Sequence, residues 1–269
     1  MKLPPAPRAV VTGAASGLGR AFAVELARRG GRVLIADVDL EASRETAQRV
    51  ERAGGQAEVL NTDVTRVEEL ERAAELAAER WGGTDLLVNN AGVAVAGAIG
   101  QVPLADWEWV LRVNLWGVIH GCHVFAPRMK TQGGGFILNV ASSAGFAALP
   151  EMAPYNVTKA AVIALSETLN AELSPAGVRV GVLCPTFFAS NLLRSFRTPS
   201  EAQRATAEAW FERAGATAEQ VARSGLEGLE RGRVLTIPQL DGRVLRWVKR
   251  LAPESYGRAL RWHQARARG

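Results

Sequence analysis

Cysteine and histidine are scarce in this sequence, which has two and three of them, respectively, among 269 residues. Cys122 and Cys184 each lie inside an apolar segment, so we expect buried free thiols rather than a disulfide. His120 and His123 are three residues apart on one predicted helix, without a third ligand nearby in the sequence. We therefore interpret them as packing or surface residues and expect no metal site.

Long hydrophobic runs are also missing. No apolar run reaches the length of about eighteen residues that a bilayer-spanning helix needs, and residues 1–5 lack the apolar centre of a signal peptide. We therefore expect a cytoplasmic protein. With 48% hydrophobic residues, the chain can bury the core of one large domain covering residues 1–269.

The positive charge is unevenly placed. The net charge is +5, yet residues 243–269 alone carry eight Lys or Arg against one acid, Glu254. A nucleic-acid partner would have to bind this tail alone, and no zinc-finger, aromatic RNA-binding or helix-turn-helix signature accompanies it. We expect no nucleic-acid binding.

Strand-like and helix-like segments alternate along residues 8–237. This order predicts an α/β fold, a doubly wound Rossmann-type sheet of about seven parallel strands with helices on both faces. The predicted strands cover residues 8–12, 32–36, 57–61, 85–89, 136–141, 178–184 and 234–237. The predicted helices cover residues 20–29, 40–53, 67–81, 107–129 and 155–173, and helical basic segments follow at the C-terminal end.

A glycine-rich loop connects the first predicted strand to the first helix. Gly13, Gly17 and Gly19, with Ser16 and Leu18 between them, would let the backbone approach a pyrophosphate while the helix N-terminus offers free N–H groups. The spacing is G-x-x-x-G-x-G, and a glycine-rich turn without a ligand is the alternative.

The second strand ends at Asp37, eighteen residues after Gly19. An acid at this position binds the adenosine ribose hydroxyls and repels a 2′-phosphate, so we expect NAD to be preferred over NADP. Two further polar groups follow later strands, Asp63 before Val64 and Asn90 before Ala91. They belong at the carboxyl edge of the sheet, where such folds bind ligands.

The predicted reaction centre is Tyr155. Lys159 lies four residues further on, on the same helical face, where a fixed ammonium would favour the phenolate and lower the tyrosine pKa. Ser142, thirteen residues before Tyr155, ends a predicted strand and could hydrogen-bond the same substrate oxygen. An exposed amphipathic helix is the alternative, because Tyr-x-x-x-Lys recurs by chance.

Two segments have two interpretations each. Residues 186–232 interrupt the alternation and are either a lid over the substrate or an ordinary helical excursion. In the tail, residues 242–269, Val244, Trp247, Val248 and Leu251 share one helical face beside basic residues. The tail either lies on an anionic membrane surface or packs over the substrate pocket or a partner subunit.

Taken together, these motifs resemble the short-chain dehydrogenase/reductase family over residues 8–237. The matching residues are Thr12 to Gly19, Asp63, Asn89 to Gly92, Asn114, Ser142, Tyr155 and Lys159. The resemblance implies that Tyr155 is the acid/base, Lys159 binds the nicotinamide ribose, Ser142 holds the substrate oxygen and Asn114 supports a proton relay. It also implies cofactor contacts from Val64, Pro185, Phe188 and Ser190.

The expected reaction is an NAD-dependent exchange of hydride with a hydrophobic secondary alcohol or ketone. Phe146, Met152 and Phe187 are expected to line the substrate side, with no Arg or Lys placed to clamp an acidic group. The alternative is a catalytically silent NAD-sensing or scaffold protein on the same fold. A homodimer through the helices of Trp107 and Tyr155 is expected, with a tetramer as the second choice.

Overall fold

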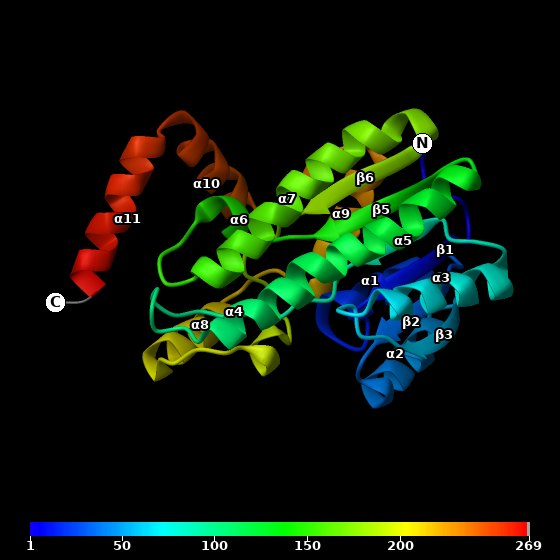
Figure 1. Cartoon of the computed structure of the whole chain (residues 1–269), viewed down its shortest axis with the longest axis horizontal. Helices are drawn as coiled ribbons and strands as arrows, with labels where there is room; N and C mark the ends of the chain where they lie inside the picture. Colours follow the sequence, from blue (N-terminus) through cyan, green and yellow to red (C-terminus); the bar gives the residue numbers. More distant parts are fainter. Residues whose placement is uncertain (268–269) are drawn as a thin grey trace.

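The computed structural model describes residues 1–267, so the last two residues of the predicted tail lie outside the described residues. A parallel sheet of seven strands lies at the centre, with helices on both faces (Figure 1). The strand order is β3-β2-β1-β4-β5-β6-β7, so the winding direction reverses between β1 and β4. The predicted Rossmann-type fold is confirmed, and ligands bind such sheets at this reversal.

The strands lie close to their predicted positions. They are β1 (Arg8–Thr12), β2 (Arg32–Asp37), β3 (Gln56–Asn61), β4 (Leu86–Asn89), β5 (Gly135–Val140), β6 (Val178–Leu183) and β7 (Leu235–Thr236). The helices are α1 (Gly17–Ala27), α2 (Leu40–Arg52), α3 (Val67–Trp81), α4 (Leu104–Leu111), α5 (Gly117–Thr131), α6 (Ala144–Ala147), α7 (Ala153–Leu173), α8 (Glu201–Glu212), α9 (Ala218–Glu230), α10 (Leu240–Leu251) and α11 (Pro253–Ala267).

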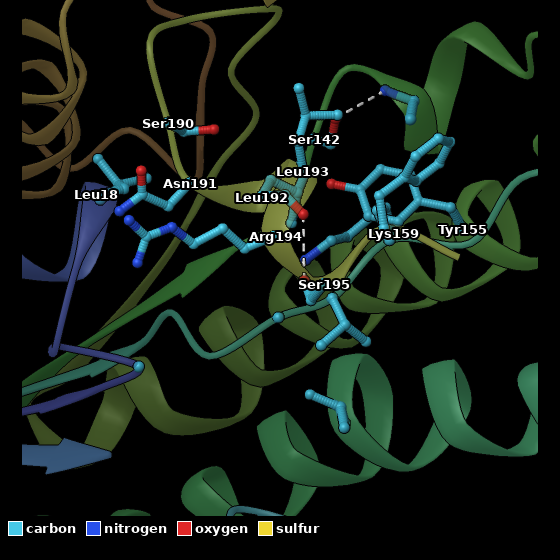
Figure 2. Close-up of a pocket in the computed structure, with 18 of the residues that line it drawn as sticks. Leu18, Ser142, Tyr155, Lys159, Ser190, Asn191, Leu192, Leu193, Arg194 and Ser195 are labelled. Carbon is cyan, nitrogen blue, oxygen red and sulfur yellow. Dashed lines mark hydrogen bonds between the residues drawn. The ribbon is translucent and has the colours of Figure 1, made fainter. Parts of the chain in front are cut away.

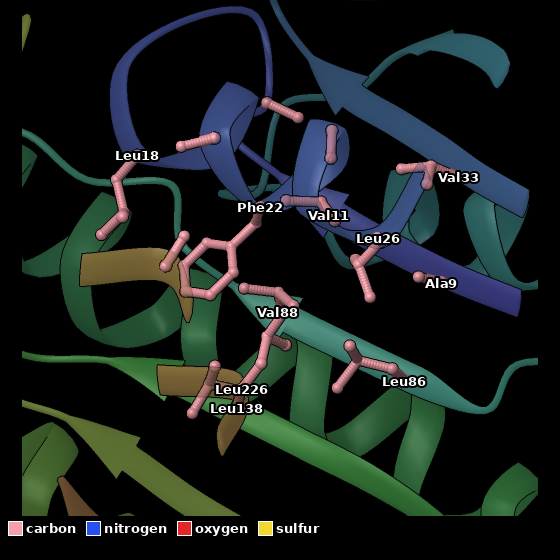
Figure 3. Packing of buried hydrophobic residues seen from close by; sticks show 14 of the residues in the cluster. Ala9, Val11, Leu18, Phe22, Leu26, Val33, Leu86, Val88, Leu138 and Leu226 are labelled. Atoms are coloured by element: carbon pink, nitrogen blue, oxygen red, sulfur yellow. The ribbon is translucent and has the colours of Figure 1, made fainter. Parts of the chain in front are cut away.

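Two apolar clusters, one on each face of the sheet, form most of the core. Figure 3 shows the cluster on the α1 face, where Phe22 packs among residues of β4, β5 and α9. Phe22 and Leu226 are fully buried there. Since α9 belongs to this core, the segment that could cover a substrate ends near residue 217, earlier than the predicted limit of residue 232.

The predicted helix at residues 107–129 is longer and is interrupted. It comprises α4, a π-helical turn at Arg112–Trp116, and α5. The turn contains Asn114, which is fully buried. A π-turn inside an α-helix often marks a functional site, because it changes the direction of the side chains around it.

The basic tail forms two helices, α10, which ends at Leu251, and α11, which begins at Pro253. Figure 1 shows the two helices projecting at one end of the molecule, far from α2 and α3. Within residues 1–267, none of the helices combines the length and the hydropathy needed to cross a membrane. Cys122 and Cys184 are both buried and unbridged, as expected.

Candidate active site

The glycine loop packs closely against the loop after β4. A Cβ atom added to Gly19 would collide with the backbone oxygen of Gly13 and would lie 2.6 Å from the Nδ2 atom of Asn90. Gly13 itself has a φ of 64°, in the left-handed region that favours glycine. The loop therefore needs glycines to make room for its neighbours. Gly13 and Gly17 line the cavity. Gly19 packs against the Gly13 backbone and is not part of the cavity lining among the described residues.

Asn90 and Thr12 hold this loop in place. The Asn90 amide donates to the backbone oxygens of Thr12, at 2.9 Å, and Gly13, at 3.0 Å. In return, the Thr12 hydroxyl accepts the N–H groups of Asn90 and Ala91. These bonds join the ends of β1 and β4, the two strands at which the sheet reverses.

The Asp37 carboxylate, at the end of β2, lies beside the glycine loop. Its Oδ2 atom accepts the N–H of Ala15 at 2.8 Å, and Oδ1 accepts that of Asp39 at 3.0 Å. Arg20, which no sequence pattern singled out, lines the same wall. Its guanidinium donates to the backbone oxygen of Ala15 and to the hydroxyl of Thr46.

Tyr155, Lys159 and Ser142 converge on one point of the cavity (Figure 2). Tyr155 and Lys159 come from the first two turns of α7, and Ser142 follows β5. The Tyr155 side chain points toward Ser142, while the Lys159 Nζ atom lies 5.6 Å from the centre of the tyrosine ring. The three predicted residues are thus brought together at the carboxyl edge of the sheet.

The tyrosine pKa moves in the opposite direction to the one predicted. Burial raises the pKa of Tyr155 to about 12 from its ordinary value of 10.0, although a hydrogen bond with Ser142 acts to lower it. Only 8% of Tyr155 is exposed. The cost of removing a phenolate from water therefore outweighs the stabilisation expected from the lysine, and the phenol keeps its proton at neutral pH.

Lys159 loses its proton more readily than an ordinary lysine. Burial lowers its pKa to about 8 from the ordinary value of 10.5. Its ammonium donates to the backbone oxygen of Val140 at 3.0 Å. At neutral pH the pair consists of a phenol and an ammonium, so it can give a proton to a substrate oxygen.

Asn114 supports the loop that faces Lys159. Its amide spans the backbone of Val93, accepting from the N–H at 2.8 Å and donating to the oxygen at 2.9 Å. The Nδ2 atom also lies 3.3 Å from the hydroxyl of Thr158. These contacts show a side chain that positions the loop 90–94.

The remaining predicted cofactor residues line the same cavity, namely Ser16, Gly17, Leu18, Asp63, Val64, Pro185, Phe188 and Ser190. The buried Oγ atom of Ser190 has no hydrogen-bond partner among the described residues. A buried hydroxyl without a partner is costly, and a polar ligand would satisfy it. This hydroxyl and the space above the glycine loop fit a nicotinamide dinucleotide.

The whole cavity has a volume of about 1450 Å³. Its substrate side includes Met152 and Phe187, and Phe187 packs against Trp210 of α8 with ring centres 5.0 Å apart. The structure does not bring Phe146 to this wall. From its place in the short helix α6, Phe146 packs instead against the core cluster on the α7 face, outside the cavity lining of the described residues.

No Arg or Lys is expected to clamp an acidic group of the substrate, and the cavity lining contains arginines besides Lys159. Arg112 and Arg194 line the cavity. In Figure 2, the Arg194 side chain extends toward Leu18, on the side of the glycine loop, and away from Tyr155. Arg194 belongs to a short 3₁₀ helix, Leu192–Ser195, in the segment after β6, and the strand and helix patterns of the sequence gave no signal for its position.

Glu151 joins the segments that cover the substrate side. Its carboxylate accepts from the amide of Gln203 in α8 at 2.5 Å and from the amide of Gln264 in α11 at 2.6 Å. Gln264 and Leu260 of α11 also line the cavity. One side of the tail therefore forms part of the pocket, which was one of the predicted placements.

A family model for short chain dehydrogenases matches residues 7–201. Together with the sheet order, this match shows that the chain belongs to the short-chain dehydrogenase family, whose members are oxidoreductases. Members of this family act on small-molecule alcohols or ketones with a nicotinamide cofactor and are typically oligomeric.

Three known proteins illustrate the similarity. The Probable oxidoreductase EphD of Mycobacterium tuberculosis is 39% identical over 184 residues, covering 68% of this chain but 31% of that relative, so the chain spans about a third of its length. A short-chain dehydrogenase/reductase of Burkholderia phymatum, solved in complex with NAD, has a TM-score of 0.89 and 32% identity, covering 94% of this chain and 96% of that chain. A short-chain dehydrogenase of Sphingobium yanoikuyae, solved in complex with NADPH, has a TM-score of 0.74 and 29% identity, covering 87% of this chain and 88% of that chain.

Proposed function

We propose that the protein is an NAD-dependent oxidoreductase that interconverts a hydrophobic secondary alcohol and its ketone. The observation that carries the proposal is the meeting of Tyr155, Ser142 and Lys159 in a cavity whose other end is the glycine loop. The nicotinamide, when bound, would accept or supply the hydride at the substrate carbon. The protein would supply the proton and hold the substrate oxygen.

In the reduction direction, the Tyr155 phenol would give its proton to the carbonyl oxygen as the hydride reaches the adjacent carbon. Ser142 would hold that oxygen by a hydrogen bond. In oxidation the same proton returns to the tyrosine oxygen as the hydride leaves the carbon. The raised tyrosine pKa supports the acid role at neutral pH, and the Lys159 ammonium favours the phenolate left after transfer.

We propose NAD over NADP because of Asp37. Its carboxylate is fixed by two backbone N–H groups at the end of β2, where the adenosine ribose of a dinucleotide is bound in such folds. A 2′-phosphate would meet a like charge there. Arg20 lies on the same wall, but its guanidinium already binds Thr46 and the Ala15 backbone.

The substrate side favours an apolar molecule. Leu149, Met152 and Leu192 line it together with the aromatic group around Phe187, and Arg194 extends toward the glycine loop instead. We therefore propose a bulky, uncharged secondary alcohol or ketone, such as an alicyclic or steroid-like compound.

A homodimer is the proposed assembly. Trp116 in the π-helical turn and Val157 on α7 are 52% and 48% exposed, although both are large and apolar. Exposed apolar residues of this kind favour a contact with another subunit. Together with the oligomeric habit of the family, they support a dimer through the α4–α5 segment and α7.

A screen of hydrophobic secondary alcohols with NAD tests the proposal through the absorbance of the NADH formed. We expect turnover with bulky apolar alcohols and little with short or acidic ones. NAD binding without turnover of any alcohol, or of the matching ketones with NADH, would instead favour a catalytically silent NAD-binding protein. A similar screen with NADP tests the cofactor preference.

A further inference from the structure

Helix α10 rests on the body of the protein through a glycine and a lysine. Gly242 is buried, and a Cβ atom added there would lie 2.8 Å from the Thr186 side chain and 2.9 Å from that of Ile237. Two turns further along the same side, the Lys249 ammonium donates to the backbone oxygen of Phe146 at 2.6 Å. These two contacts fix which side of α10 faces the protein.

The opposite side of α10 carries large apolar residues that face away from the protein. We call it the outer stripe, and it consists of Leu240, Val244, Trp247, Val248 and Leu251, which are 73%, 52%, 60%, 45% and 76% exposed. Their spacing places them on one helical face. An amphipathic helix that packs on its own core buries this face, so α10 has the reverse orientation.

Basic side chains lie beside the outer stripe on α10 and continue along α11, while Lys249 and Arg243 also donate to backbone oxygens of the protein body. The described part of α10 and α11 has two acids, Asp241 and Glu254, against seven cations. The seven cations are Arg243, Arg246, Lys249, Arg250, Arg258, Arg261 and Arg266. Trp262 of α11 is also 58% exposed, and the Arg266 guanidinium lies 3.9 Å from the centre of its ring. Exposed tryptophans beside cations are typical of surfaces that contact lipid headgroups.

Another side of α11 lines the substrate cavity through Leu260 and Gln264. The same pair of helices thus carries an exposed apolar stripe and a wall of the pocket. A surface bound to the outer stripe would therefore lie at the end of the molecule that carries α10 and α11, away from α2 and α3 (Figure 1).

We propose that the outer stripe of α10 docks on a membrane surface that contains anionic phospholipid, with the arginines of α10 and α11 contacting the lipid phosphates. The excess of cations provides the charge complementarity. Two copies of the chain that met through this stripe about a two-fold axis would bring their like charges together, so a second copy fits the surface less well.

Co-sedimentation of the full chain with vesicles tests the proposal. We expect binding at low salt to phosphatidylcholine vesicles that contain about one third phosphatidylglycerol, and at least roughly tenfold weaker binding to phosphatidylcholine alone. Raising the salt should release the protein, because exposed charges are then screened.

Two double variants separate the apolar and the charge contributions. Trp247→Ser with Leu251→Ser removes the centre of the outer stripe, and Arg250→Glu with Arg258→Glu reverses two exposed charges. Each should weaken vesicle binding by roughly tenfold or more. Because all four side chains are exposed, thermal unfolding of both variants should resemble that of the unchanged protein.

The matched control is Arg44→Glu with Arg72→Glu. Both arginines are exposed, but they lie on α2 and α3, far from the tail. This variant changes the net charge by the same amount as the charge reversal in the tail. It should retain most of the vesicle binding.

Light scattering of the same proteins measures their oligomer mass and tests whether a second copy of the chain, rather than a membrane, covers the outer stripe. If the full chain does not bind anionic vesicles, or binds neutral ones equally well, the proposal is wrong. It is also wrong if the two stripe substitutions leave vesicle binding unchanged. A smaller oligomer mass for that variant would then show that the outer stripe is a contact between copies of the chain.

Discussion

The two ends of the cavity are held in place by different means. At the cofactor end, backbone groups are bound by Asn90 and Asp37, which lie at the ends of strands. At the substrate end, α8 and α11 come from distant parts of the chain and share the carboxylate of Glu151. We infer that the cofactor end tolerates little change, whereas the substrate end can adjust at modest cost.

The largest effect at the junction of the two ends is expected for Lys159→Met. Loss of the ammonium should lower turnover by roughly 10²-fold or more, since acid/base groups contribute about 10² to 10⁴. The free energy of unfolding, in contrast, should rise in this variant. The lysine pKa is about 8 in the folded protein and 10.5 ordinarily, so the charged form opposes folding by about 3 kcal/mol below pH 8.

The destabilisation of the folded protein by the charged Lys159 decreases as the pH rises from about 8 to 10.5, where the unfolded chain also loses the proton. Loss of the Lys159 hydrogen bond to the Val140 backbone oxygen reduces the gain in stability by about 1 kcal/mol. We therefore expect Lys159→Met to be more stable by about 2 kcal/mol at pH 7, with the gain shrinking toward alkaline pH. Urea unfolding at several pH values measures it, and a loss of stability at pH 7 would contradict the assigned shift.

At the cofactor end, we expect Gly19→Ala to lower the free energy of unfolding by about 1 to 3 kcal/mol and to weaken NAD binding, because the added Cβ would meet the Gly13 backbone. Gly215→Ala is the matched control, since a Cβ there meets nothing within 4 Å among the described residues. Thermal unfolding and NAD titration of both variants test the difference, and equal behaviour would show that the loop is not tightly packed.

Asp37→Ser should reduce the preference for NAD over NADP by roughly tenfold, because the carboxylate that repels a 2′-phosphate is gone. Comparing kcat/KM for the two cofactors in both proteins measures this ratio. An unchanged ratio would mean that Asp37 does not face the bound ribose.

The smallest effect is expected at the substrate end. Glu151→Ala removes the acceptor shared by Gln203 and Gln264, so KM for the substrate should rise by about threefold with little change in kcat, as expected for lost binding alone. Glu212→Ala, at the exposed end of α8, is the control. A large fall in kcat for Glu151→Ala would show that this carboxylate acts on the reaction itself.

This contrast also explains which features the sequence could predict. The strands, the glycine loop and the placement of Asp37 depend on neighbours in the chain, and the structure has them as predicted. The positions of Phe146, Arg194 and Glu151 depend on the path of short helices and loops and on contacts between distant residues. No local pattern reports such contacts, and the tyrosine pKa similarly depends on burial that only the folded protein shows.

Tyr155→Phe tests the central claim most directly. The substitution keeps the ring but removes the hydroxyl, so we expect turnover to fall by about 10² to 10⁴ while NAD affinity stays within roughly threefold of the unchanged protein. Turnover should be followed by NADH absorbance and affinity by direct titration. A variant that retains more than roughly a tenth of the turnover would contradict the assignment of Tyr155 as the proton-transfer group.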